Sequence, residues 1–142
     1  MFAYPVKIIK DGEFYLVSFR DFEGSDPITQ GFSYEEALSM AKDWLLCEAG
    51  IALDNGEKLP EASEPEEGEV MVEMPLSAQV KLMLLYEMLD QSVSGSELAR
   101  RMNIKRPNVQ KIIKADHATK IDTLDMAMHA LGKKIRIELV SA

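Results

Sequence analysis

The chain has 142 residues, of which 46% are hydrophobic and 28% are charged, and it carries a formal net charge of −8. This length allows one ordinary domain or two small ones, and the apolar content excludes a disordered chain. The apolar runs are far shorter than the ~20 residues of a bilayer-spanning helix and the N-terminus lacks the pattern of a signal peptide, so we expect a cytoplasmic protein with no membrane partner.

The N-terminal region has the pattern of a β-hairpin. Residues 4–9 and 14–19 are short runs rich in aromatic and β-branched side chains, which favour strands. Asp11-Gly12 lies between the two runs, and this dipeptide supplies the positive φ angle of a tight turn. A short third strand is expected within residues 25–31.

The next segment is predicted to be a helix that covers the sheet. Ser33 and Glu36 have the spacing of a capping box. Behind them, apolar residues recur at helical spacing and form one face, until Asn55-Gly56 provides a stop signal. The single cysteine, Cys47, lies among apolar neighbours on this helix, so we interpret it as a small buried hydrophobe.

A domain boundary is predicted near Pro75. Residues 57–69 are polar and acidic, which is typical of a solvated loop, and residues 70–74 have the composition of a strand that returns to the sheet. The charge balance then changes sign, because residues 1–75 hold 5 Lys/Arg and 17 Asp/Glu whereas residues 76–142 hold 11 and 7. Such asymmetry indicates two domains with separate partners, the basic one suited to phosphates and the acidic one to a basic protein.

The second domain is predicted to be helical until its last residues. Residues 76–89 leave so little polar surface that their helix must be buried, in a core or in a dimer contact. Gly132 is expected to stop the last helix. Residues 135–140 then alternate between apolar and polar, which predicts a strand. A terminal strand needs a partner, and pairing with the same strand of a second copy is one solution.

Residues 94–114 have the pattern of a helix-turn-helix. Ser94 and Glu97 make a capping box, Asn103 tolerates the left-handed conformation of a tight reversal, and Pro107 suits the first turn of a second helix. The apolar anchors that fit two short, closely crossing helices are Leu98, Met102, Ile104, Val109, Ile112 and Ile113. Because cap, turn and anchors agree, we predict a DNA-binding motif here.

The second helix of such a motif presents its N-terminal side chains to base edges in the major groove. Arg and Lys favour guanine, and Asn and Gln can pair with adenine. The candidates for base contacts are Lys105, Arg106, Asn108, Gln110 and Lys111. The candidates for phosphate contacts are Arg101, Lys114 and Lys120. A solvated basic helix is the alternative, but the amides among these cations favour DNA.

Taken in order, these motifs resemble those of the HicB antitoxins of bacterial toxin–antitoxin pairs. In the first half the resemblance rests on Tyr4-Pro5-Val6, Tyr15-Leu16-Val17-Ser18-Phe19-Arg20-Asp21, Thr29-Gln30-Gly31 and Glu35-Glu36-Ala37. In the second half it rests on Glu97-Leu98-Ala99-Arg100-Arg101, His117-Ala118-Thr119-Lys120-Ile121-Asp122 and Ala130-Leu131-Gly132-Lys133-Lys134. The resemblance therefore covers nearly the whole chain.

The resemblance implies an α+β chain with two parts. Residues 1–75 would form a small, reduced ribonuclease-H-like domain of order β-β-β-α-β, followed at 76–142 by a helical helix-turn-helix domain with a terminal strand. The first domain would bind and inhibit a HicA-type toxin, a small mRNA-cleaving protein. The second would bind the operator double-stranded DNA of the pair's own operon. Homodimers or higher oligomers are implied, and no cofactor is.

A metal-dependent nuclease is the alternative that a ribonuclease-H-like fold raises. That chemistry needs several carboxylates converging on divalent metal ions, and the first of them normally stands within the opening strand. Residues 4–9 contain no acid, only Lys7, and Asp11 and Glu13 lie in the turn. We therefore expect the fold without the catalytic set, no bound metal and no enzyme activity.

Contacts with the toxin are expected on the acidic first domain, since an RNA-cleaving protein should have a basic substrate surface. The acids that follow the second strand are Asp21, Glu23 and Asp26. Phe19 and Phe22 are candidates for an apolar anchor, although either could instead belong to the core. A stand-alone helix-turn-helix transcriptional regulator whose first domain senses a small ligand is the alternative function.

Overall fold

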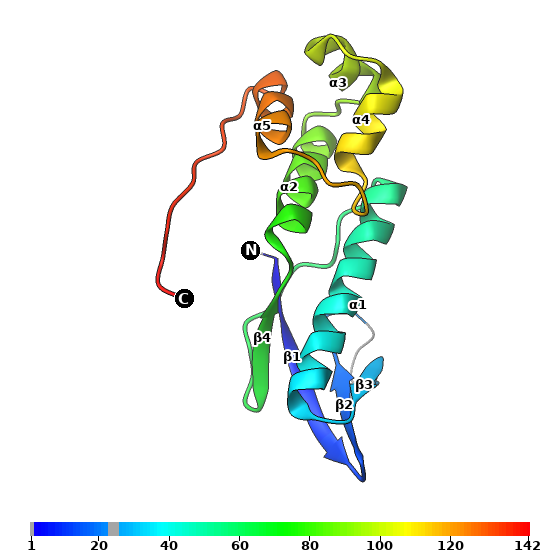
Figure 1. The fold of residues 1–142 in the computed structure, drawn as a ribbon, viewed down its shortest axis with the longest axis vertical. Coiled ribbons are helices and arrows are strands. Elements are labelled where there is room, and N and C mark those ends of the chain that lie inside the picture. Colours follow the sequence, from blue (N-terminus) through cyan, green and yellow to red (C-terminus); the bar gives the residue numbers. More distant parts are fainter. Residues whose placement is uncertain (1, 23–25) are drawn as a thin grey trace.

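The computed structural model describes residues 2–22 and 26–142. Figure 1 shows a sheet covered by a long helix at one end of the molecule and the shorter helices at the other. The first group consists of β1 (Ala3–Asp11), β2 (Phe14–Ser18), β3 (Thr29–Gly31), α1 (Tyr34–Asn55) and β4 (Glu69–Glu73). The second group consists of α2 (Leu76–Asp90), α3 (Gly95–Met102), α4 (Arg106–Ile113) and α5 (Ile121–Ala130). This order confirms the predicted α+β class.

The strands form one antiparallel sheet in the order β3-β2-β1-β4. The predicted hairpin is confirmed, because β1 and β2 pair directly and Gly12 takes a φ of +62° in the turn between them. Strand β3 is shorter than the expected range and occupies only Thr29–Gly31. Of the expected range, Ser25 lies outside the described residues, whereas residues 26–28 are described and are not part of a strand.

Helix α1 begins and ends where its capping residues predict. The Ser33 hydroxyl accepts a hydrogen bond from the Glu36 amide at 3.1 Å, and Gly56 ends the helix with a φ of +65°. The buried face of α1 consists mainly of alanines. Its residues are Ala37, Ala41, Leu45, Ala49, Ala52 and Leu53. At the start of α1 the strand backbone comes very near, since a Cβ on Gly31 would lie 2.5 Å from the Ala37 nitrogen.

Helix α2 contributes to both hydrophobic cores. Ala78, Leu82 and Leu85 pack into the core that also contains the sheet and α1. Leu84 and Met88 belong to the core shared with α3, α4 and α5. The predicted burial is therefore confirmed for the faces of α2 that pack into these cores, whereas Leu76, Met83 and Leu89 are exposed. The domain boundary near Pro75 stays a prediction, because one helix serves both cores.

Two expectations from the sequence differ from the structure. Cys47 is exposed on the outer side of α1, so the interpretation as a buried hydrophobe is wrong. Residues 135–140 form no strand, and Leu139 is 96% exposed. A strand exists only when it is paired, and within the described ranges the single chain offers this segment no partner. Across those same ranges, no helix is long and apolar enough to cross a membrane.

Candidate functional site

The predicted pair of short helices in the second half is confirmed. The Ser94 hydroxyl accepts from the Glu97 amide at 3.1 Å and starts α3. Asn103 ends α3 with a φ of +55°, and the Ile104 amide then donates to the Ala99 carbonyl at 3.0 Å. The buried side chains that join the two helices are Leu98, Ala99, Val109 and Ile112, with Met102, Ile104 and Ile113 partly buried beside them. We call this pair of helices the α3–α4 unit.

The N-terminus of α4 is open and electropositive. Lys105 is its N-cap residue and provides no side-chain hydrogen bond, and Pro107 stands in the first turn. The first turn contains Arg106 and no acid. Pro107 has no N–H, and the Asn108 amide donates to the Lys105 carbonyl at 2.9 Å. An anion would therefore be attracted to this end by the positive end of the helix dipole and by the side chains of Lys105 and Arg106.

The predicted DNA-contacting side chains are all exposed. They are Arg101, Lys105, Arg106, Asn108, Gln110, Lys111, Lys114 and Lys120. Most lie on α4 or at its caps, whereas Arg101 is on α3 and Lys120 directly precedes α5. Gln110, Lys111 and Lys114 line a groove together with Leu53 and Asp54 at the end of α1. Asp54 therefore brings a negative charge to the edge of an otherwise cationic face.

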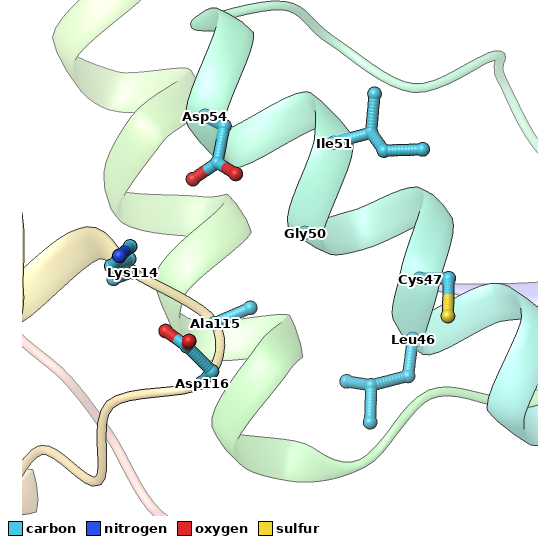
Figure 2. A pocket seen from close by; sticks show the side chains of 8 residues that line it. All are labelled: Leu46, Cys47, Gly50, Ile51, Asp54, Lys114, Ala115 and Asp116. Carbon is cyan, nitrogen blue, oxygen red and sulfur yellow. The ribbon is translucent and has the colours of Figure 1, made fainter.

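A second pocket lies beside that groove, between α1 and the segment that follows α4. Its lining residues include Cys47, Gly50, Asp54, Lys114 and Asp116, and Figure 2 shows them around the opening. Lys114 lines both pockets, so it faces carboxylates from two elements. The nearby carboxylates make Lys114 a weaker candidate for a phosphate contact than Lys105 or Arg106.

Arg101 is held more firmly than the sequence indicated. Its guanidinium donates to a Glu97 carboxylate oxygen at 3.0 Å and to the Ala130 carbonyl at 3.2 Å. Arg100 donates to both oxygens of the same carboxylate. These hydrogen bonds from Arg100 and Arg101 lower the pKa of Glu97 to about 2. Arg101 thus joins α3 to α5, and its charge is shared with Glu97.

Lys81 is a positioning residue that the sequence analysis missed. It is 2% exposed on α2, and its ammonium group donates to the carbonyl oxygens of Lys114 and His117. Burial lowers the pKa of this lysine. These bonds attach the segment after α4 to α2 and so set where α4 ends. The signal was present, because a lysine inside an apolar helix must find acceptors if it is buried.

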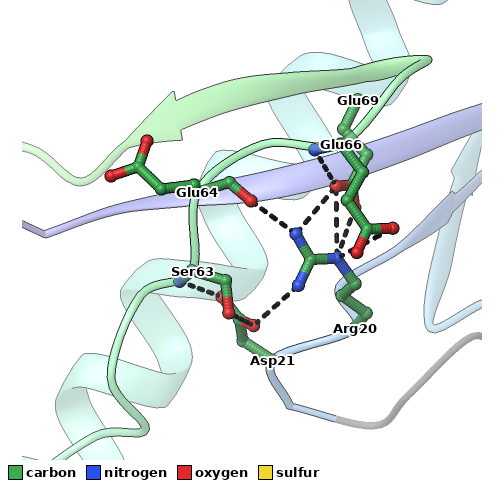
Figure 3. A network of polar contacts seen from close by, with 6 residues as sticks. All are labelled: Arg20, Asp21, Ser63, Glu64, Glu66 and Glu69. Atoms are coloured by element: carbon green, nitrogen blue, oxygen red, sulfur yellow. Dashed lines mark hydrogen bonds and ion pairs between the residues drawn. The ribbon is translucent and has the colours of Figure 1, made fainter.

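In the first half, a polar network fixes the acidic loop to the sheet (Figure 3). Arg20 donates to both carboxylate oxygens of Glu69, at 3.0–3.2 Å, and to the Glu64 carbonyl at 2.6 Å. Asp21 accepts from the amide and the hydroxyl of Ser63 at 2.9 and 2.6 Å. The side chains of Asp21 and Glu69 are only 7% and 5% exposed. These charges therefore serve the fold, which their sequence positions did not indicate.

The five predicted toxin-contacting residues separate into buried and accessible ones. Phe19 is fully buried and stacks on Trp44 with 5.0 Å between ring centroids, so the core alternative holds for it. Asp21 is engaged with Ser63 as described above. Phe22 is partly exposed and Asp26 is exposed. Glu23 lies outside the described residues.

The carboxylates do not gather into a metal site where the structure is described. In residues 2–22 and 26–142, no group of three or more His, Cys, Asp or Glu side chains could hold a metal ion. In β1, the strand that would carry the first ligand of a ribonuclease-H centre, Asp11 is the last residue, at the turn.

Comparison with known proteins gives one consistent family. A family model described as HicB_like antitoxin of bacterial toxin-antitoxin system matches residues 3–83. The chain is 37% identical over 134 residues to a protein named Antitoxin HicB 2 from Photorhabdus laumondii subsp. laumondii, which covers 94% of each chain. It is 34% identical over 138 residues to Antitoxin HicB of Escherichia coli K12, which covers 96% of this chain and 99% of the relative. Both halves are thus included in the similarity.

Proposed function

Because the chain belongs to the HicB-like antitoxins of bacterial toxin–antitoxin systems, we propose that it neutralises a HicA-type mRNA-cleaving toxin and represses its own operon by binding operator double-stranded DNA. The family membership confirms the resemblance predicted from the motifs. In this proposal the protein acts by binding and has no enzyme activity or cofactor. We place it in the cytoplasm, because the proposed operator DNA is there.

The observation that carries the DNA-binding part is the exposed face of α4. The helix starts without a side-chain cap, and Lys105 and Arg106 add two cations at that end. Asn108 and Gln110 follow on the exposed surface, where amides can read base edges that cations alone would not distinguish. The α3–α4 unit thus combines phosphate attraction with groups capable of direct readout.

The neighbouring elements support the same role for α4. Lys81 and Arg101 hold the α3–α4 unit against α2 and α5, so the helix stands on a rigid base. Helix-turn-helix proteins commonly bind as dimers to two half-sites one DNA turn, ~34 Å, apart. We therefore include a homodimer or a higher oligomer in the proposal.

The toxin-binding part rests on family membership and on charge. Residues 1–75 hold 17 Asp/Glu against 5 Lys/Arg, which complements the basic surface of an RNA-cleaving protein. Asp26 and the partly exposed Phe22 are the accessible members of the predicted contact set. Phe19 and Asp21 act in our proposal through the fold, because one is in the core and the other anchors Ser63.

Two measurements test the two parts separately. Co-expression with the product of the adjacent gene, followed by an RNA-cleavage assay on the released partner, tests neutralisation. A tight complex whose partner cleaves RNA only when freed is the expected result. A protein that binds operator DNA but has no such partner would instead be a stand-alone regulator with a ligand-sensing first domain.

For DNA binding, the expected result is a salt-dependent affinity for the promoter region of its own operon. Gln110→Ala should reduce the preference for operator over unrelated DNA, since it removes a base-reading amide. Gln30→Ala is the matched control, because Gln30 is exposed on β3 at the other end of the chain. Equal affinity of the wild type for operator and unrelated DNA would contradict the proposal.

A further inference from the structure

The C-terminal end of α4 packs on the first half of the molecule. Ile113, the last residue of α4, contacts both hydrophobic cores, and Ala115 packs against the core that contains the sheet and α1. Leu53 of α1 is buried in that core and lines a groove together with Gln110 of α4. Figure 1 shows the end of α4 next to the end of α1. The helix proposed to read DNA is therefore in contact with the half proposed to bind the toxin.

Gly50 leaves room on α1 for this approach. A Cβ built on Gly50 would lie 3.7 Å from the Cβ of Ala115, which is ordinary van der Waals contact. Figure 2 shows Ala115 facing α1 beside Gly50. Alanine would therefore fit at residue 50, whereas a larger side chain would extend into the space of Ala115. We call the four residues Gly50, Leu53, Ile113 and Ala115 the α1–α4 contact.

Helix α2 fixes the same segment of the chain. The Lys81 ammonium group donates to the carbonyl oxygens of Lys114 and His117, which lie on either side of Ala115 in the sequence. Lys114 also ends α4, and its amide donates to the Gln110 carbonyl at 3.0 Å. The end of α4 is therefore held by packing on α1 and by hydrogen bonds from α2.

A small displacement at this end would be amplified at the other end of α4. The helix has eight residues and is ~12 Å long, so a tilt of ~10° about its C-terminal end would move its N-terminus by ~2 Å. Hydrogen bonds to base edges tolerate much less, because donor–acceptor distances stay within ~2.7–3.2 Å. The attraction between cations and phosphates changes more gradually with distance. A tilt would therefore weaken base reading more than it weakens phosphate attraction.

We propose that the α1–α4 contact orients α4 for operator reading, so that Gly50 and Ala115 are positioning residues although neither belongs to the predicted DNA contacts. The inference rests on the proposed operator binding and adds a role of the first half in it. A closed contact preserves the preference for operator over unrelated DNA. An opened contact reduces that preference and leaves the salt dependence of binding nearly unchanged.

A disulfide across the contact tests the geometry without DNA. In a Cys47→Ser background, Gly50→Cys with Ala115→Cys places two Cβ atoms 3.7 Å apart, within the ~3.5–4.5 Å of unstrained disulfides. Mild oxidation should form this bond within one chain, as measured by intact mass and thiol titration. Ser39→Cys with Ala115→Cys is the matched control, because residue 39 lies ~16 Å further along α1. Absence of a bond between residues 50 and 115 would overturn the proposal.

The oxidised protein then tests what the contact does. Fluorescence anisotropy with operator and unrelated DNA compares the oxidised and reduced forms of Gly50→Cys with Ala115→Cys. We expect the oxidised form to keep the operator preference of the wild type. A preference that is lost on oxidation and regained with reductant would show that α4 leaves α1 to bind DNA, which overturns the proposal. A wild type without operator preference, in a protein where the disulfide forms, would instead contradict operator binding itself and the inference that rests on it.

Opening the contact should have the opposite result. Gly50→Ile adds a β-branched side chain whose χ1 angle is confined in a helix, so it cannot readily turn away from Ala115. The operator preference should fall roughly tenfold, which corresponds to one lost base contact. Gly50→Ala should keep the preference because its Cβ fits, and Ser39→Ile is the control for the added side chain.

A wedge from the other side of the contact gives an independent variant. Ala115→Leu should lower the operator preference like Gly50→Ile, and the double variant should lose little more, because one wedge already opens the contact. Far-UV circular dichroism and the midpoint of urea unfolding check that each variant is folded. An operator preference that is unchanged in both single variants would overturn the proposal.

Discussion

Two groups of charged residues, one in each half of the chain, have opposite structural roles. Arg20 binds the Glu69 carboxylate and Asp21 accepts from Ser63, and these bonds hold the 57–68 loop on the sheet. At the N-terminus of α4, Lys105 and Arg106 are exposed on a helix end without a side-chain cap. The first group stabilises the fold, whereas the second is available to a partner. The comparison teaches that charge density in a sequence does not by itself locate a binding surface.

The largest expected effect tests whether Phe19 belongs to the fold or to a partner surface. Phe19→Ala removes a fully buried ring that stacks on Trp44, and should lower the free energy of unfolding by about 3–5 kcal/mol. Urea denaturation measures it. Phe32→Ala is the control, because Phe32 is 67% exposed. Lost toxin inhibition at unchanged stability would instead place Phe19 in the toxin contact.

The second prediction concerns the buried cation of the second half. Lys81→Met keeps the apolar stem but leaves the Lys114 and His117 carbonyls without their donor, so stability should fall by about 1–3 kcal/mol. The midpoint of urea unfolding measures the change. Lys42→Met, at an exposed position of α1, should alter the midpoint little. Equal midpoints for the two variants would show that the Lys81 bonds do not stabilise the protein.

The separation along the chain between interacting residues decides which structural features can be predicted from sequence. The hairpin turn at Gly12 and the caps at Ser33 and Ser94 depend on residues a few positions apart, and all were predicted. The Arg20–Glu69 and Lys81–Lys114 contacts join residues 49 and 33 positions apart. A local pattern can show that a lysine in an apolar helix needs acceptors, but it cannot identify which distant residues provide them. Whether a charge is free or engaged is a property of the tertiary structure.

The terminal segment shows a different limit of sequence analysis. The alternation from Ile135 to Leu139 predicts a strand, yet the single chain leaves those residues extended and unpaired. Local pattern identifies a segment suited to pairing, but the partner decides whether a ladder forms.

Exposure of the α4 side chains was predictable because a two-helix motif leaves one face of its second helix open.

The third prediction tests the free charges of α4. Lys111→Ala should weaken operator binding several-fold and reduce the slope of affinity against salt by about one, because a phosphate contact or nearby cation is lost. Stability should stay within about 0.5 kcal/mol of the wild type, since Lys111 is exposed. Fluorescence anisotropy at several salt concentrations measures it, with Lys42→Ala as the control. An effect on stability without an effect on DNA would place Lys111 with the structural charges.

The smallest effect concerns Glu97, whose carboxylate binds both arginines of α3. Its pKa of about 2 lies below the ordinary 4.5, so the ionised carboxylate stabilises the folded state above pH 4.5. That contribution should decrease as the pH falls from about 4.5 towards about 2. Unfolding midpoints of the wild type and Glu97→Gln are compared at pH 7 and pH 3, with Glu67→Gln as an exposed loop control.

The Glu97 comparison has a second consequence for the DNA-binding face. The carboxylate shares the charge of Arg101, so Glu97→Gln should slightly strengthen binding to DNA while it weakens the attachment of α3 to α5. The two effects have opposite signs, and one variant therefore separates a charge used in folding from a charge offered to a partner. If the variant lost stability and DNA affinity together, Arg101 would act on DNA only through its position in the fold.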